Sequence, residues 1–261
     1  MKSTGTFKTM TQRSTDLLRV IIALSIIAMA SGCANNDEEE ETPVQNLTEA
    51  YELAQTAIAN KNYRRGIQIF EAIQARYPFS EISRQVQLEL MYAYYKGAQK
   101  EQAIEAADTF MRENPIHERV DYALYIKGLA YFVDEAGFLE RRFKKDISER
   151  PPVDVAEAYS AFRRLVERYP ASKYAPDAEQ RMVFLKNRLS AYENNVADYY
   201  LRRGAYVAAL NRAKNALEEY NGAPGNADSL RIMAESYEKL GMADLAADTR
   251  RVLALNFPGE S

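Results

Sequence analysis

The sequence predicts an all-α fold built from repeated pairs of helices. Beyond Leu47 no alternation of apolar and polar residues is sustained, and apolar residues recur every three or four positions, as in Leu53, Ala57 and Ile58. Short segments with Pro, Gly or Asn separate these stretches. The breaks recur with a regular spacing, which indicates that one helical unit is repeated along the chain.

Four prolines end equivalent segments. Each segment has a small residue, an apolar residue four positions later, another three further on, and the proline five beyond that. The four sets are Gly66, Phe70, Ile73 and Pro78; Ala103, Ala107, Phe110 and Pro115; Ala158, Phe162, Leu165 and Pro170; and Ala246, Arg250, Leu253 and Pro258. Arg250 is the one departure. The pattern predicts a helix that crosses its neighbour closely at the small residue and stops before the proline.

The position twelve residues before each small residue is also informative. It is occupied by Ala54 and Ala234 in the first and last units and by Met91 in the second. This spacing resembles that of the tetratricopeptide repeat, a unit of about 34 residues with two antiparallel helices. Five units are expected, at 47–78, 84–115, 121–170, 190–222 and 227–258.

Two units depart from the common spacing. In the third, Gly128 and Ala158 stand in the small positions but are separated by an insertion. The fourth pairs Ala197 with Ala209 and is preceded by residues 175–194, which we expect to form an extra or extended helix that ends near Asn194 and Asn195. Stacked units of this kind form a superhelix whose concave face is lined by first helices.

The first 32 residues have the features of a secretory signal peptide. Four Lys or Arg residues precede an apolar run from Val20 to Ala30, and Ser31 and Gly32 follow. Eleven residues span about 16 Å, roughly half of a bilayer core, so the run is too short for a stable membrane span. The chain has one Cys, Cys33, directly after these small residues.

This arrangement resembles a bacterial lipobox, although Ala30 replaces its usual Leu. The resemblance implies that Cys33 is lipidated and becomes the mature N-terminus, and Ala34 after it favours the outer membrane, facing the periplasm. Ordinary signal cleavage beside a buried free Cys is the alternative. Residues 35–46 contain five consecutive acids and few apolar groups, which predicts a flexible tether; an acidic metal site is the alternative there.

Composition excludes several kinds of function. The net charge of −3 provides no basic footprint for nucleic acid. A single Cys and a single His, His117, exclude an intrachain disulfide and most zinc or catalytic-diad chemistry. No phosphate-binding glycine motif occurs. We therefore expect no catalytic residues, no metal and no cofactor.

The insertion in the third unit is basic in an otherwise acidic chain. It carries Arg141, Arg142, Lys144 and Lys145 within residues 136–152. It is either a docking loop for an acidic partner or lipid headgroups, or a solvated hairpin between helices.

The predicted concave face of the first three units is rich in aromatic residues. Its inward positions are Tyr51, Leu88, Tyr92, Tyr95, Tyr122, Tyr125 and Phe132. Such a row suits an extended or hairpin peptide rich in apolar side chains. Three nearby cations are candidates to receive a carboxylate: Arg84, Lys96 and Arg119. The alternative is that several of the tyrosines pack between repeats.

Four longer stretches resemble the BamD family of tetratricopeptide lipoproteins. They are KNYRRGIQIFEAIQARYPFS (61–80), QVQLELMYAYYK (85–96), ENPIHERVDYALYIKGL (113–129) and RMVFLKNRLSAYENNVADYYLRRGAY (181–206). The resemblance implies a non-catalytic part of the outer-membrane β-barrel assembly machine, which binds unfolded outer-membrane proteins and docks a POTRA module of BamA beside other lipoproteins of that machine. It also implies interface roles for Tyr199, Arg203 and Tyr206. A pilotin or other cell-envelope assembly lipoprotein with the same repeats is the alternative function.

The expected organisation follows from these observations. It comprises a signal peptide (1–32), a lipidated N-terminus and acidic tether (33–46), N-terminal repeats with a substrate groove (47–135), the basic insertion (136–152) and C-terminal repeats for partner docking (153–261).

Overall fold

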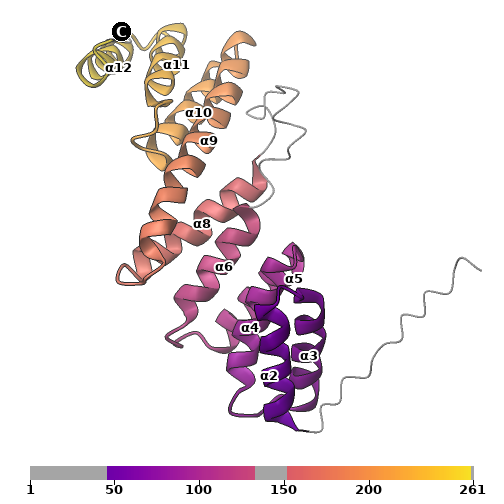
Figure 1. The fold of residues 1–261 in the computed structure, drawn as a ribbon. Coiled ribbons are helices and arrows are strands. Elements are labelled where there is room, and N and C mark those ends of the chain that lie inside the picture. The colour runs from indigo at the N-terminus through magenta and orange to yellow at the C-terminus, as the bar shows by residue number, and fades with distance from the viewer. Residues whose placement is uncertain (1–45, 133–151, 260–261) are drawn as a thin grey trace, which may run out of the picture. The chain divides into compact units, whose positions relative to one another are not determined.

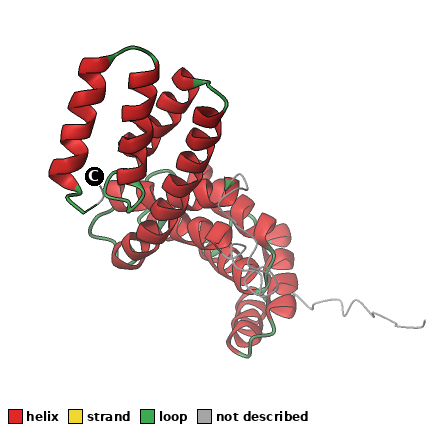
Figure 2. Ribbon diagram, turned by 90° about the horizontal axis from the view of Figure 1, so that it is seen from above, coloured by secondary structure: helices red, strands yellow, loops and turns green. Residues whose placement is uncertain are grey.

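The computed structural model describes residues 46–132 and 152–259, and all regular elements in these ranges are α-helices (Figures 1 and 2). The helices are α2 (Leu47–Ala59), α3 (Tyr63–Arg76), α4 (Ser83–Lys96), α5 (Lys100–Glu113), α6 (Val120–Phe132), α8 (Val153–Arg168), α9 (Ala175–Arg202), α10 (Tyr206–Glu219), α11 (Asn226–Lys239) and α12 (Ala243–Asn256). The predicted signal peptide, Cys33, the acidic stretch and the basic cluster lie outside the described residues.

Each helix packs against its neighbours in the chain, so that the described helices form five hairpins: α2 with α3, α4 with α5, α6 with α8, α9 with α10, and α11 with α12 (Figure 1). Successive hairpins then stack, α3 on α4 and α5 on α6. The predicted all-α tetratricopeptide-repeat superhelix is confirmed.

Local sequence explains where the second helices begin and end. The side chain of Asn62 accepts a hydrogen bond from the amide of Arg65 (3.2 Å) and caps the start of α3. The last residues of the second helices are followed by caps at Tyr77, Asn114, Tyr169 and Phe257, each directly before a proline. A proline disfavours helical backbone in the residue before it, so the helices stop there.

The small residues identified in the sequence lie where paired helices cross. Ala54 and Gly66 are buried between α2 and α3, and Gly128 is buried between α6 and α8. A methyl group added at Gly128 would stand only 2.5–2.8 Å from ring atoms of Phe162, which is itself fully buried. Any larger side chain would therefore force these helices apart. Arg250, the departure from the pattern, is exposed and forms an ion pair with Glu238.

The expectation that a helix ends near Asn194 and Asn195 is wrong. α9 runs without interruption from Ala175 to Arg202. The Asn194 amide does not compete with the helix backbone, because it donates to the carbonyl oxygen of Gly225 (2.7 Å) and accepts from the Ser229 hydroxyl (2.7 Å). The first helix of the fourth unit is thus the second half of one long helix, and the first half of that helix contacts α6.

Candidate binding surfaces

The aromatic residues expected on the inner face begin with Tyr51 on α2. Its half-buried ring packs against Phe70, with centroids 5.7 Å apart, and its hydroxyl accepts a hydrogen bond from Gln55 (2.9 Å). Burial, and after it the negative charge of Glu89 on α4, raises the pKa of the Tyr51 hydroxyl. The inner face between α2 and α4 therefore carries a carboxylate as well as aromatic rings.

On α6, Tyr122 and Tyr125 pack on Tyr174, which directly precedes α9. The ring centroids of Tyr125 and Tyr174 are 4.7 Å apart in a stacked arrangement, and those of Tyr122 and Tyr174 are 5.5 Å apart. The Arg119 guanidinium lies 4.8 Å from the Tyr122 centroid and donates to the Tyr174 hydroxyl (3.4 Å). Burial, reinforced by Tyr174 and Glu89, raises the pKa of the Tyr122 hydroxyl.

The contacts continue along α9. The Tyr125 hydroxyl donates to Asp177 (2.8 Å), and Arg181 donates to the same carboxylate (2.6 Å). Burial and the hydrogen bond to Asp177 raise the pKa of Tyr125 to about 12. The hydrogen bond from Arg181 lowers the pKa of Asp177. The Arg181 guanidinium also lies 4.9 Å from the centroid of Phe132, whose ring packs edge-on against Phe184.

Not all of the expected groove residues are available to a ligand. Leu88 is only 6% exposed and belongs to the core between the second and third repeats, so it is not a groove residue. Tyr92 and Tyr95 are half-buried against the same core. Leu88 lies on the side of α4 that faces α6, where the next repeat stacks.

The three expected cations do not form one cluster. Arg84 lies in the first turn of α4 and Lys96 is its last residue, so their backbones are about 18 Å apart along the helix axis. The Lys96 ammonium lies 5.9 Å from the Tyr95 centroid. Among the described residues Arg119 has no carboxylate partner. Of the three, Arg119 is therefore the cation embedded in the aromatic contacts.

Sequence reasoning missed Glu89, Tyr174, Asp177 and Arg181. The last three follow one another at spacings of three and four, which places them on one face of a helix. That spacing could have predicted that the three side chains lie together. The repeat pattern did not predict the course of α9, whose first half places this face against α6.

The residues expected at the partner interface do lie together, at the turn between α9 and α10. The Arg203 guanidinium stands 5.4 Å from the Tyr199 centroid, and Tyr199 is 48% exposed. Gly204, with φ of +75°, forms the turn, and Tyr206 begins α10. Within the described residues Arg203 has no acidic partner, whereas its neighbour Arg202 forms an ion pair with Asp198.

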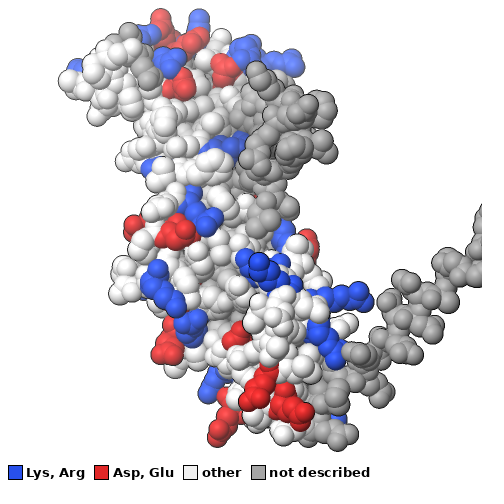
Figure 3. All heavy atoms as spheres, in the orientation of Figure 1, with Lys and Arg blue, Asp and Glu red and all other residues white. Residues whose placement is uncertain are grey.

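Within residues 46–132 and 152–259, no three His, Cys, Asp or Glu residues come together as metal ligands would. No helix of these ranges has the length and apolar character needed to cross a membrane. Figure 3 shows acidic and basic side chains interspersed with uncharged surface on the face in view.

Comparison with known proteins assigns the family. Residues 43–253 match YfiO, described as outer membrane lipoprotein. The chain belongs to the YfiO family. An outer membrane protein assembly factor BamD of Neisseria meningitidis is 42% identical over 242 residues, which cover 93% of this chain and 91% of that protein. A BamD of Vibrio cholerae is 38% identical over 237 residues, covering 90% of this chain and 96% of that protein. The resemblance to the BamD family found in the sequence is confirmed.

Proposed function

We propose that this member of the YfiO family is a non-catalytic scaffold of the β-barrel assembly machine. In this proposal it binds unfolded outer-membrane proteins with its N-terminal repeats and docks a POTRA module of BamA with its C-terminal repeats, beside other lipoproteins of the machine. The relatives named as outer membrane protein assembly factors support this function over that of a pilotin, because they match nearly the whole chain.

The proposed location is the periplasmic face of the outer membrane. The family description as an outer membrane lipoprotein supports an anchor at Cys33. Several acyl chains on one residue contribute about 0.8 kcal/mol per buried CH₂ and hold a protein stably on a bilayer. Neither nucleic acid nor a cofactor has a part in the proposed function.

The proposal of substrate binding rests on the position of Arg119. Its guanidinium stacks on Tyr122 and reaches Tyr174, and among the described residues it has no carboxylate to neutralise it. A peptide whose last residue is aromatic offers both a ring for these tyrosines and a terminal carboxylate for the guanidinium. Part of the expected groove is used for packing between repeats, so the peptide contacts the remaining exposed edges of the rings.

Binding of a peptide with the C-terminal residues of a barrel protein tests this function. We expect Arg119→Gln to weaken the peptide with a free carboxylate by about tenfold, roughly 1.4 kcal/mol. The same peptide with an amidated C-terminus should bind both proteins equally weakly. Arg64→Gln on the exposed surface of α3 is the matched control. Equal sensitivity of both peptides to Arg119→Gln would contradict the assignment of the carboxylate.

The partner is tested by affinity purification from mildly solubilised outer membranes. Stoichiometric recovery of a barrel protein with POTRA domains is the expected result. Recovery of pilus or peptidoglycan proteins in its place would favour the pilotin function.

A further inference from the structure

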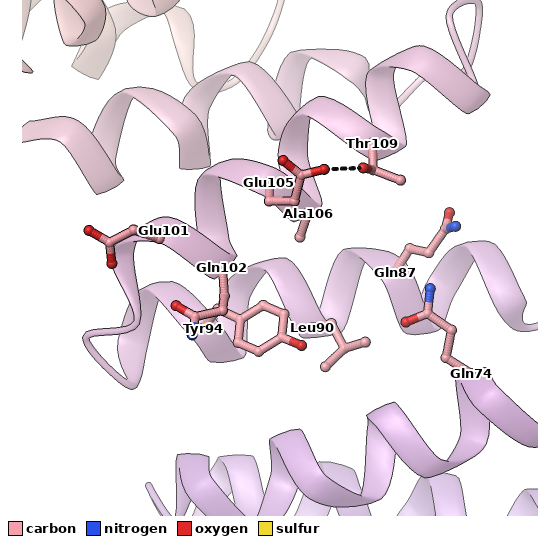
Figure 4. A pocket seen from close by; sticks show the side chains of 9 residues that line it. All are labelled: Gln74, Gln87, Leu90, Tyr94, Glu101, Gln102, Glu105, Ala106 and Thr109. Atoms are coloured by element: carbon pink, nitrogen blue, oxygen red, sulfur yellow. Dashed lines mark hydrogen bonds between the residues drawn. The ribbon is translucent and has the colours of Figure 1, made fainter.

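A groove with a different composition lies along another side of α4. Two cavities, of about 480 and 590 Å³, share Gln74 of α3 and Gln87 of α4 as lining residues. Because they share these residues, the two cavities adjoin each other along α4, between α3 and α5, and we call them together the α4 groove. Figure 4 shows Gln74 and Gln87 at one end of the first cavity and Glu101 at the other, with Leu90 and Tyr94 between them.

The α4 groove is separate from the aromatic inner face. Leu90 and Tyr94, which line the groove, are each two positions from Tyr92, and residues two apart project to opposite sides of a helix. No residue of the aromatic contacts around Arg119 lines either cavity. A ligand can therefore occupy the groove without touching the inner face.

The floor of the groove is apolar and fixed in place. Leu90 is buried and Ala106 is half-buried beneath it. The ring of Tyr94 is held by a hydrogen bond of 2.7 Å from its hydroxyl to Glu71 on α3, and burial together with this carboxylate raises the pKa of the hydroxyl. Preformed apolar surface of this kind suits small apolar side chains.

The rim of the groove is acidic. Glu81, Glu101, Glu105 and Glu113 line it, against a single cation, Arg84. Glu105 is oriented by a hydrogen bond from Thr109 (3.1 Å), drawn as a dashed line in Figure 4, and Glu113 by one from Gln87 (2.9 Å). Among the described residues no Lys or Arg is paired with Glu101 or Glu105. These carboxylates favour a cationic ligand and repel phosphate groups.

The amides on the rim and the length of the groove indicate the form of the ligand. Gln74 and Gln102 make no side-chain hydrogen bond within the described residues, and each offers a donor and an acceptor to a peptide backbone. The lining residues of α4 run from Ser83 to Tyr94, about 16 Å along the helix axis, which an extended chain of about six residues spans. Phe79, whose side chain is fully exposed, stands at one end.

We propose that the α4 groove binds a basic, extended segment of about six residues from a partner protein. Its lysines or arginines contact the glutamates of the rim, its backbone contacts Gln74 and Gln102, and its small apolar side chains lie over Leu90 and Ala106. The occupant is a peptide rather than nucleic acid or a lipid headgroup, because the groove offers four carboxylates and a single cation, Arg84, to phosphate.

The test is binding of the capped peptide Lys-Ala-Arg-Val-Ala-Lys, with a fluorescent label, to the full mature chain in detergent. Glu101→Gln combined with Glu105→Gln should weaken the peptide by about tenfold. The matched control is Glu49→Gln combined with Glu52→Gln on α2. It makes the same change in net charge, and in both double variants one of the two substitutions lies in the first turn of its helix. This control should leave the affinity within about twofold.

A second measurement locates the bound peptide. The chain has no Trp, so Phe79→Trp places a single tryptophan beside the groove without removing a proposed contact to the peptide. Its emission should shift to shorter wavelength when the peptide binds, whereas Asn60→Trp, at the exposed end of α2, should show no shift.

Three results would overturn the proposal: no saturable binding up to about 1 mM peptide, equal losses in the two double variants, or equal binding of a peptide with Glu in the place of its basic residues. Arg119→Gln should not affect this peptide, so a failure here is distinguishable from failure of the proposed substrate site. Tight binding of an anionic oligonucleotide or of anionic vesicles that shifts the Phe79→Trp emission would be a fourth result against it.

Discussion

The Tyr125 hydroxyl on α6 donates a hydrogen bond of 2.8 Å to Asp177 on α9, although the two residues lie 52 positions apart in the sequence. Arg181 binds the same carboxylate from one turn further along α9. This group fastens the first half of the long helix to the third repeat, and it explains why the tyrosines of α6 are only partly available as a binding surface.

The first prediction concerns the acid sensitivity of this contact. Because the pKa of Asp177 is lowered in the folded chain, its ionised form stabilises the fold above the ordinary carboxylate pKa, and this stabilisation is lost as the pH falls through the lowered value. The Asp177 side chain is 44% exposed, so solvent screening limits the effect of Asp177→Asn on the free energy of unfolding to about 1 kcal/mol at pH 7.

Urea unfolding of the wild type and Asp177→Asn checks this prediction. The difference between the two free energies should be constant from pH 7 down to about pH 5 and should shrink as the pH falls further, toward pH 3. Tyr125→Phe, which leaves the ion pair with Arg181, should show a smaller loss. A difference that grows as the pH falls would contradict the assigned direction of the pKa shift.

The second prediction concerns the helix crossing at Gly128. A methyl group there would meet the buried Phe162 ring at 2.5–2.8 Å, so Gly128→Ala should destabilise the fold by about 1–3 kcal/mol. Gly66→Ala would approach the Cδ1 atom of Ile58 even more closely than Gly128→Ala approaches Phe162, but Ile58 is a flexible, half-buried side chain that can move aside. Its cost should be smaller, and thermal unfolding of both variants measures the difference. A larger loss in Gly66→Ala would show that the third repeat is the looser one.

Much of this fold could be predicted from the sequence because the crossing of two helices depends on local signals. A small residue such as Gly66 or Gly128, and a proline after the second helix, are both visible without knowledge of distant contacts. The length of α9 was not predictable in this way. The sequence around Asn194 predicts a helix end, and only the hydrogen bond from its side chain to Gly225, 31 positions away, shows that this asparagine joins α9 to the start of α11.

The candidate site was predictable to a smaller extent. Helical phase indicated which side of α6 carries Tyr122 and Tyr125, but it contained nothing about Tyr174 and Asp177, which cover that side. Similarly, Leu88 and Tyr92 share a stripe of α4, and only the stacking of the third repeat decides that Leu88 is buried.

The third prediction concerns the buried amide of Asn194, which is 6% exposed and bonded to both Gly225 and Ser229. Asn194→Ala leaves the Gly225 carbonyl and the Ser229 hydroxyl without this partner, so we expect a loss of about 1–3 kcal/mol in the free energy of unfolding. Asn215→Ala, at an exposed position of α10, is the control and should change it by less than about 0.5 kcal/mol. Chemical denaturation measures both, and equal effects would show that the amide pair is dispensable.

The fourth prediction concerns the proposed anchor. Cys33→Ser removes the sulfur to which lipid would be attached, so the variant should incorporate no labelled palmitate and should no longer float with membranes in a density gradient. Wild-type protein grown in parallel supplies the comparison. Continued labelling of Cys33→Ser would contradict lipidation at this residue.

The fifth prediction compares the two neighbouring arginines at the end of α9. Arg202 is neutralised by Asp198, whereas Arg203 lies on the Tyr199 ring with no acidic partner in the described residues. An arginine stacked on an aromatic ring has a fixed orientation and retains its donors for a partner's carboxylate.

Arg203→Ala should therefore reduce recovery of the POTRA-containing barrel protein strongly, with an affinity loss of about tenfold or more, while Arg202→Ala should change it by less than about threefold. Quantitative co-purification, normalised to the amount of tagged protein, measures the two effects. Circular dichroism of both variants controls for folding, since each substitution removes one exposed arginine from the same helix end. If the two variants lost the partner equally, general positive charge would explain the docking, and the stacked geometry of Arg203 would have no special part in it.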